Sequence, residues 1–274
     1  MENIATTASS EIIESASPEP LDPTERPDFV TALARGISVI RAFGPDAARM
    51  TLADIAKRVN LPRATVRRSL ITLETLGYVE SDGRNFTLTP KVLTLGHSYL
   101  SSSPFTRAAQ PLLERFAATI HESSWVAILD ETDALLVAGA RTNRILSPGL
   151  TVGSRLPAAW SSLGRALLSG LSDDELDAFL RRVKPRTYTA RTMIDLSAIR
   201  KAIMDVRANG YALVDGEVEI GLSSISVPVK NFEGRTVAAI NASAPSERVR
   251  STEMIERFLP LLQRTAEDLR PALV

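Results

Sequence analysis

The segment Phe29–Pro90 constrains the fold of this chain more than any other stretch. Apolar residues recur at steps of three and four in Phe29–Phe43, in Thr51–Asn60 and in Arg63–Leu76, which predicts three amphipathic helices. Gly77 is the expected end of the third helix. Two short β-like runs separated by "DGRN" follow and predict a hairpin. Helices, a tight turn, a helix and a hairpin in this order are typical of a winged helix-turn-helix.

The residues at the ends of these segments support their boundaries. Thr51, with Asp54 three residues later, has the spacing of a helix capping box. Asn60–Pro62 forms a short turn, and Pro62 suits the start of a helix. The first helix carries one apolar face and the third carries a core stripe. These are Val30, Leu33, Ile37, Ile40 and Phe43, and then Val66, Leu70, Leu73 and Leu76.

Basic residues gather at the start of the third helix, away from its core stripe. With 3.6 residues per turn, Arg63 and Arg67 share one face, and Thr65 and Arg68 flank it. A recognition helix contacts bases with its N-terminal residues, and the planar fork of arginine suits a guanine edge or a phosphate. Arg84 at the hairpin tip is placed to contact a phosphate or the minor groove. Each arginine alone is compatible with a solvated face, but the whole pattern favours DNA binding.

The charge is distributed unevenly although the net charge is zero. Residues 1–25 hold six acidic residues and no Lys or Arg, whereas residues 26–91 hold eleven basic and six acidic residues. Such asymmetry indicates that the basic segment meets a polyanion. The Pro, Ser and acidic content of residues 1–27 predicts a disordered acidic tail. An arm that orders on a partner is the alternative for this segment.

Several classes of protein are disfavoured by composition. The chain has no cysteine, which excludes disulfides and thiolate metal sites and fits a cytoplasmic location. No apolar run approaches the roughly 18 residues of a membrane span, and no secretory signal is visible. The two histidines, His97 and His121, lie on predicted connecting helices without an evident catalytic partner. We therefore expect no enzyme, no cofactor and no metal site.

Residues 104–274 interleave apolar strand-like runs with amphipathic helices, which predicts a mixed α/β sheet layered with helices. Asp173, Asp174 and Glu175 indicate the acidic first turn of a helix rather than a metal site, because they complement the helix dipole. Ser161 or Ser162 begins another helix, "SSLGRALLSGL".

Several motifs carry a resemblance to a known family. "LARGISVIRAF", "TLADIAKRVNLPRATVRRSLITLETLGYV" and "FTLTPKVLTLGHSYLSS" resemble the DNA-binding half of IclR-type transcriptional regulators. The similarity continues in "VGSRLPAAWSSLGRALLSGL", "ANGYALVDGEVEIGLSSISVPV" and "VAAINASAPS". "RATVRRSLITLETLGYV" and "RLPAAWSSLGR" resemble in particular the Pca/Pob subgroup, which regulates aromatic-acid catabolism through the β-ketoadipate pathway. The resemblance implies an α+β chain with a winged helix-turn-helix at 28–90, a linker helix at 91–103 and a GAF-like effector-binding domain at 104–274.

Candidate effector contacts follow partly from this resemblance. It implies contacts from Ser162, Leu163, Ser224, Asn241 and Ser243, although family members often carry cysteine where Ser224 stands. The helix start at Ser161 offers backbone N–H groups to an anion. Trp160 either packs in the core or lines the pocket. Arg155 and Glu219 are candidate pocket charges, with an ion pair from Arg155 to Glu219 or Asp215 as the alternative.

The expected function is a dimeric or tetrameric regulator of a catabolic operon. Each winged helix would contact one half-site of a palindromic operator. A small carboxylate effector, an aromatic acid or a β-ketoadipate-type product, would shift the protein between arrangements. The alternatives are a regulator of another pathway with a glyoxylate-like or pyruvate-like effector, a ligand-independent DNA binder, and a pathway enzyme.

Overall fold

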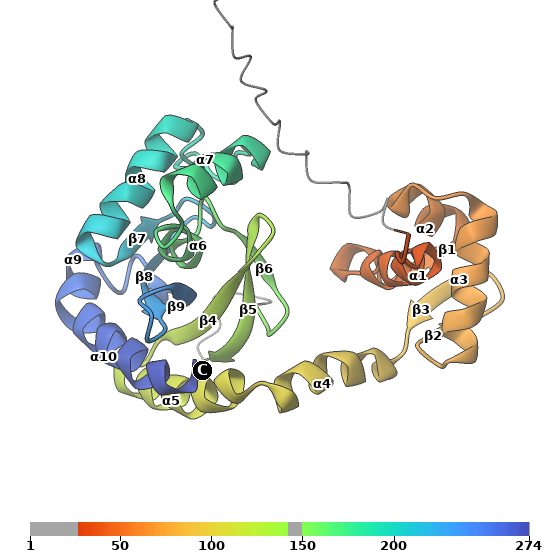
Figure 1. The fold of residues 1–274 in the computed structure, drawn as a ribbon, viewed down its shortest axis with the longest axis horizontal. Coiled ribbons are helices and arrows are strands. Elements are labelled where there is room, and N and C mark those ends of the chain that lie inside the picture. The colour runs from red at the N-terminus through yellow and green to blue at the C-terminus, as the bar shows by residue number, and fades with distance from the viewer. Residues whose placement is uncertain (1–26, 142–149, 274) are drawn as a thin grey trace, which may run out of the picture. The chain divides into compact units, whose positions relative to one another are not determined.

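The computed structural model describes residues 27–141 and 150–273, and the predicted tail thus lies almost wholly outside the described residues. The chain divides into two compact units, Met1–Leu95 and Gly96–Val274 (Figure 1). Among the described residues, no helix has the length and apolarity to cross a membrane.

The first unit is a winged helix-turn-helix, as the sequence predicted. Its three-stranded antiparallel sheet has the order β1-β3-β2. Strand β1 was not expected, because a strand of three residues is too short to show a periodicity. The elements are α1 (Thr31–Arg41), a 3-10 turn (Pro45–Ala47), β1 (Arg49–Thr51), α2 (Leu52–Val59), α3 (Arg63–Thr75), β2 (Val79–Ser81), β3 (Asn85–Leu88) and a 3-10 turn (Pro90–Val92). Helix α4 (Leu93–Ser102) starts in this unit and ends in the second one.

The predicted helix boundaries are confirmed by local hydrogen bonds. The Thr51 side chain accepts a hydrogen bond from the Asp54 amide, and the Asp54 carboxylate accepts one from the Thr51 amide, which completes the capping box. Asn60 ends α2 in the left-handed conformation with φ 51°. Gly77 follows α3 with φ 78°, a value that strains residues with a Cβ.

The predicted core of this unit is only partly correct. Val66, Leu70 and Leu73 are buried, but Leu76 is 51% exposed. On α1 the buried residue is Val39, whereas Leu33 is 63% exposed and belongs to an open apolar face. The reason is geometric: α1 packs against the other helices on one side only, and part of its wide apolar stripe has no cover within this unit. That part, with α3 and Leu95, lines a groove of 740 Å³.

The second unit is built on one six-stranded sheet with the order β6-β5-β4-β9-β8-β7, in which neighbouring strands pair antiparallel. Its elements are α5 (Pro104–Ile120), β4 (Ser123–Asp130), β5 (Asp133–Ala140), β6 (Arg155–Pro157), α6 (Ser162–Leu168), α7 (Asp173–Arg182), α8 (Leu196–Asn209), β7 (Ala212–Asp215), β8 (Leu222–Lys230), β9 (Thr236–Pro245), α9 (Ser251–Glu253), a π-helical turn (Met254–Phe258), α10 (Leu259–Leu269) and a 3-10 turn (Arg270–Ala272).

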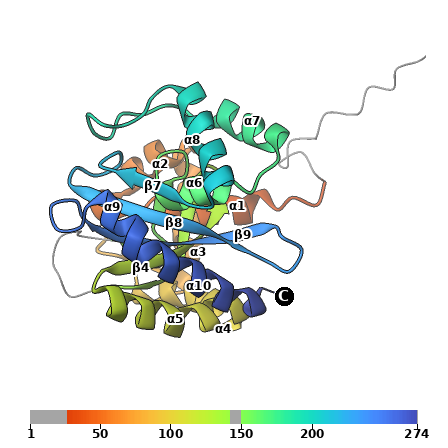
Figure 2. The same ribbon diagram turned by 90° about the vertical axis from the view of Figure 1, so that its left-hand side faces the viewer.

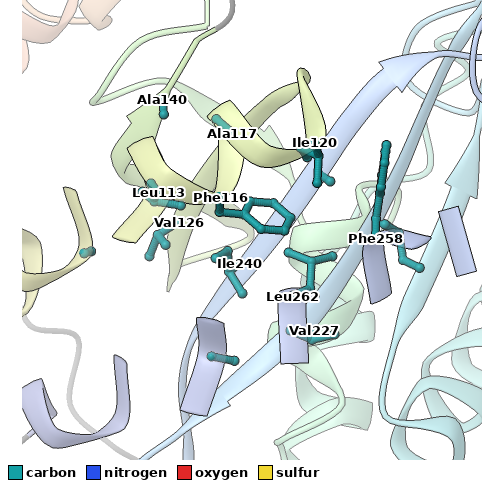
Figure 3. Packing of buried hydrophobic residues seen from close by; sticks show 14 of the residues in the cluster. Leu113, Phe116, Ala117, Ile120, Val126, Ala140, Val227, Ile240, Phe258 and Leu262 are labelled. Atoms are coloured by element: carbon teal, nitrogen blue, oxygen red, sulfur yellow. The ribbon is translucent and has the colours of Figure 1, made fainter. Parts of the chain in front are cut away.

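Helices cover both faces of this sheet (Figure 2). Helices α5 and α10 lie on one face, where Phe116 and Leu262 meet Val126 and Ile240 of the central strands (Figure 3). Helix α6 packs on the other face through Leu163, with α8 beside it. The expected helix-layered α/β architecture is confirmed, and it places α6 directly over strands β8 and β9.

Candidate DNA interface and effector site

The start of helix α3 presents exposed cations. Arg63, Arg67 and Arg68 are exposed, and Thr65 is half-buried beside them. Val66 on the opposite side is fully buried, because it faces the small core of the unit. No ion pair joins these three arginines to a carboxylate among the described residues. Their guanidinium groups are therefore available to an external anion.

The wing tip is held by a single carboxylate. Asp82 accepts hydrogen bonds from the amides of Arg84 at 2.9 Å and Asn85 at 2.7 Å, and it pairs with Arg49 of β1. The Asn85 amide bond, followed by the Arg49 contact, holds the pKa of Asp82 well below its usual range. This turn fixes the backbone at Arg84, and the Arg84 guanidinium has no carboxylate partner among the described residues.

The second unit contains a cluster of neutral polar side chains, here called the serine cluster, formed by Ser162, Ser224, Ser226, Ser243 and Asn241. The Ser162 hydroxyl donates to Ser224 at 2.7 Å, and Ser226 donates to Ser162 at 2.7 Å. The Asn241 amide nitrogen donates to Ser224 at 3.0 Å and to Ser243 at 2.8 Å. Ser224 and Ser243 lie 3.0 Å apart, oxygen to oxygen.

The strand register assembles this cluster. Ser224 is opposite Ser243, and Ser226 is opposite Asn241, in the antiparallel pair β8–β9. Residues two apart on a strand share a face, so all four side chains point to the side that α6 covers. Helix α6 adds Ser162 from above. Ser226 was missed in the sequence, although its position two residues after Ser224 is a signal that the period of a strand could have revealed.

One hydroxyl donor of the cluster, that of Ser243, has no acceptor within the cluster. The Trp125 amide donates to the Asn241 side-chain oxygen at 2.8 Å, which directs the amide nitrogen toward the serines. Ser224 already accepts from Ser162 and Asn241, so its own proton goes to Ser243, because a hydroxyl has only two lone pairs. The Ser243 proton then has no acceptor among the cluster residues. Ser224 and Ser243 are also the half-buried members, whereas Ser226 is fully buried.

The first turn of helix α6 already uses one of the backbone N–H groups that the sequence suggested for an anion. Helix α6 has only seven residues, and the Ser161 side chain itself accepts from the Gly164 amide at 3.1 Å. Leu163 is fully buried in the hydrophobic core beside Trp125. The polar groups that the structure shows converging on the serine cluster are side chains of α6, β8 and β9.

Three further candidates lie in other surroundings. Trp160 is buried in a separate hydrophobic cluster, and its indole N–H donates to the Met193 carbonyl at 2.5 Å. Arg155 pairs with Asp130 and Asp133 of the β4–β5 hairpin, not with Glu219 or Asp215 as considered from the sequence. Glu219 is exposed.

A different ion pair of this unit has both of its partners buried. Arg165 of α6 is 4% exposed and Glu217 is 9% exposed. They form two hydrogen bonds of 2.8 and 2.7 Å, and the Arg165 Nε donates to the Ala159 carbonyl at 2.9 Å. This pair ties the helix that carries Ser162 to the connection between β7 and β8. From the sequence, Arg155 and Glu219 were the expected pocket charges, because an amino-acid sequence does not show which side chains are buried.

The chain combines a winged helix-turn-helix with an α/β unit that contains an internal polar cluster. This combination is typical of transcriptional regulators that carry a DNA-binding unit and a second unit on one chain. The IclR helix-turn-helix domain matches residues 32–83, and the bacterial transcriptional regulator IclR C-terminal domain matches residues 97–270. The chain belongs to the IclR family, which confirms the resemblance seen in the sequence.

Relatives narrow the similarity to one subgroup. The chain is 45% identical over 247 residues to the Pca regulon regulatory protein of Pseudomonas putida, covering 90% of this chain and 85% of the relative. It is 34% identical over 260 residues to the p-hydroxybenzoate hydroxylase transcriptional activator of Acinetobacter baylyi, covering 93% and 96%. The predicted similarity to the Pca/Pob subgroup is thus confirmed.

Solved structures agree with this placement. An IclR family transcriptional regulator from Brucella abortus has a TM-score of 0.76 at 28% identity, covering 91% of this chain and 96% of that one. A double mutant of the PobR inducer-binding domain from Acinetobacter, in complex with 3-hydroxybenzoic acid, has a TM-score of 0.57 at 32% identity. That match covers 60% of this chain and 96% of the domain.

Proposed function

We propose that this protein regulates transcription of an operon for aromatic-acid catabolism and that a small aromatic carboxylate binds at the serine cluster. The observation that carries the proposal is the cluster itself: neutral donors gathered between α6 and strands β8 and β9, with one hydroxyl proton left over at Ser243. The similarity to regulators named for the Pca regulon and for p-hydroxybenzoate hydroxylase supports the aromatic class.

DNA contact runs through the exposed face of α3 and the wing tip. We assign base or phosphate contacts to Arg63, Thr65, Arg67 and Arg68, with Arg84 reaching the backbone or the minor groove. The absence of carboxylate partners for these arginines within the described residues supports the assignment. The protein acts in the bacterial cytoplasm, where its operator lies.

The chain works as a homo-oligomer in this proposal. Leu33 and Ile37 of α1, Leu76 after α3 and Leu95 of α4 form an exposed apolar face on the DNA-binding unit. When a second copy of the chain covers this face, apolar surface is removed from water, which favours association. A two-fold pair of winged helices would then match a palindromic operator.

The chemistry of the cluster suits an oxygen-bearing ligand. Hydroxyl donors stabilise a carboxylate or phenol oxygen without a buried countercharge, and a ligand that enters reorganises the bonds of Ser224 and Ser243. The sequence-derived contacts at Trp160, Ser161, Leu163, Arg155 and Glu219 are secondary in this proposal, because their side chains are packed, paired or exposed elsewhere.

Isothermal titration calorimetry with a ligand panel tests the proposed effector class. The panel is protocatechuate, 4-hydroxybenzoate, catechol, β-ketoadipate, pyruvate and glyoxylate. We expect heat with aromatic acids or with β-ketoadipate, and an accompanying change in operator affinity. Heat with pyruvate or glyoxylate alone would contradict the aromatic assignment. Chromatography of the ligand after incubation should return it unchanged, since we propose a regulator and not an enzyme.

A pair of variants tests the site. Ser224→Leu should fill the cluster and abolish ligand binding while operator binding without ligand persists. Thr119→Leu is the matched control, because Thr119 is exposed on α5, on the other face of the sheet. Equal ligand affinity in the two variants would move the effector site away from the serine cluster.

A further inference from the structure

The C-terminal end of the recognition helix is bonded to the residues that begin the linker helix. The Leu76 carbonyl, at the C-cap of α3, accepts a hydrogen bond from the Lys91 ammonium at 2.7 Å. The Gly77 carbonyl accepts from the Thr89 hydroxyl at 2.6 Å. The Tyr78 carbonyl accepts from the Thr89 amide at 2.9 Å. Three successive carbonyls after α3 are thus satisfied from residues 89–91.

These contacts have a clear physical basis. The last carbonyls of a helix have no partner within it and carry the negative end of its dipole, so a lysine there is favourable. The Lys91 ammonium also lies 5.3 Å from the centre of the Tyr78 ring, within the range of a cation–π contact. Lys91 is thereby held by one group at the C-cap of the recognition helix and by one on the connection that follows it.

The same two residues also start the linker helix. The Thr89 side chain caps the turn Pro90–Val92 by accepting from the Lys91 amide at 3.3 Å. The Lys91 carbonyl accepts from the Thr94 hydroxyl at 2.7 Å. Helix α4 begins at Leu93, directly after this turn, and the boundary between the two units falls after Leu95 within α4. No extended residue separates the anchor on α3 from the helix that enters the second unit.

We propose that Thr89 and Lys91 are positioning residues that couple the linker helix to the recognition helix. A change in the direction of the first turn of α4 must either break their bonds to the end of α3 or carry α3 with it. The Lys91 bond ends on the C-cap of α3, and the two Thr89 bonds end on the residues that directly follow it, not on the wing tip. The coupled element is therefore the end of the helix that bears Arg63 and Arg67. This inference rests on the proposed function, since it describes how ligand binding would reach the DNA contacts.

The experiment separates coupling from binding. Thr89→Val, Lys91→Met and the double variant remove the side-chain donors, and Lys91→Arg keeps the charge and a donor. Lys201→Met, an exposed lysine on α8, is the matched control for loss of a charge. For each protein, calorimetry gives the affinity for 4-hydroxybenzoate or the aromatic acid that binds best. Operator affinity is measured with and without that acid at several salt concentrations.

In the double variant we expect ligand affinity, ligand-free operator affinity and its salt slope to stay within about threefold of the wild type. The ligand-induced change in operator affinity, typically about 5–150-fold in coupled systems, should fall toward unity. Lys91→Arg and Lys201→Met should keep the wild-type change.

Two results would overturn the coupling. One is a ligand response in the double variant equal to that of the wild type. The other is a fall in ligand-free operator affinity with a salt slope reduced by about one in Lys91→Met, which would make Lys91 a phosphate contact. A wild-type protein whose operator affinity ignores every acid of the panel would instead overturn the proposed function, and the coupling with it.

Discussion

The arginines of the two units have different surroundings. On the recognition helix and the wing tip, Arg63, Arg67, Arg68 and Arg84 are exposed and lack carboxylate partners among the described residues. In the second unit, arginines on β6, α6, α8, the π-helical turn and several loops form ion pairs. The paired arginines there are Arg155, Arg165, Arg191, Arg200, Arg207, Arg235, Arg248 and Arg257.

The difference shows what each set of charges does. A buried guanidinium has lost its water and needs a carboxylate and carbonyls to compensate, as Arg165 has in Glu217 and Ala159. An exposed guanidinium keeps its water until an anion replaces it. DNA phosphates release counterions when such cations bind, so unpaired arginines on one face favour nucleic acid without a folding cost. We propose that the exposed set contacts DNA, whereas the buried Arg165 helps to hold the fold.

The largest expected effect comes from breaking the buried pair. Arg165→Met leaves Glu217 charged and without its partner, which should lower the free energy of unfolding by about 3–5 kcal/mol. Arg165→Met with Glu217→Met should recover most of this loss. Urea unfolding followed by circular dichroism measures both. A single variant as stable as the wild type would mean that the pair is not buried in solution.

Replacing an exposed arginine of the recognition helix should weaken DNA binding without changing the stability of the fold. Arg67→Ala should weaken operator binding by about 1–3 kcal/mol and relax specificity at one base pair, if it contacts a base. Its free energy of unfolding should stay within about 0.5 kcal/mol of the wild type. Arg181→Ala, an exposed arginine on α7, is the control. Gel-shift titrations that show equal losses for both variants would contradict the contrast between the units.

Arg49 differs from the other arginines of the DNA-binding unit discussed above, because it is paired with a carboxylate, Asp82. Asp82→Ala frees the amides of Arg84 and Asn85, and we expect operator affinity to fall by about 0.5–1.5 kcal/mol despite the loss of a negative charge. Asp82→Asn keeps an acceptor for the turn and should bind at least as tightly as the wild type. A gain in affinity for the alanine variant would show that repulsion, not the turn, dominates.

The smallest expected effect concerns an ion pair near the surface. Hydrogen bonds from Ser223 and Ser246 hold the pKa of Asp215 below its ordinary value, with a contribution from Arg191. Because the folded pKa is the lower one, this stabilisation is fully present above the unfolded pKa near about 4 and is lost as the pH falls through the folded pKa.

Asp215→Asn should therefore lower the free energy of unfolding at pH 7 by at most about 1 kcal/mol, since solvent screens a side chain that is 36% exposed. The difference in free energy of unfolding between Asp215→Asn and the wild type, measured by urea titration, should become smaller below about pH 4. If this difference is the same at pH 7 and pH 3, the carboxylate charge contributes nothing to stability.

The sequence by itself determined the helices of the winged unit, their caps and the exposed arginines. Periodicity identified α2 and α3, because long amphipathic patterns are local signals. Thr51, Asp54 and Gly77 act through neighbouring backbone groups, so their effects are visible without a fold. The family resemblance added Ser162, Ser224, Asn241 and Ser243, which the β8–β9 register and helix α6 bring together in one cluster.

Only the tertiary structure decided which polar and apolar groups are enclosed. Arg155 and Arg165 both lie in the motif "VGSRLPAAWSSLGRALLSGL", yet only Arg165 is buried. The reason is that α6 packs on the sheet with the side that carries Arg165. Ser226 joins the serine cluster through a strand pairing across the β8–β9 hairpin, and Leu76 stays exposed although it continues an apolar stripe. Burial depends on contacts between segments that are distant in the sequence. A local pattern does not show which of those segments will pack against it.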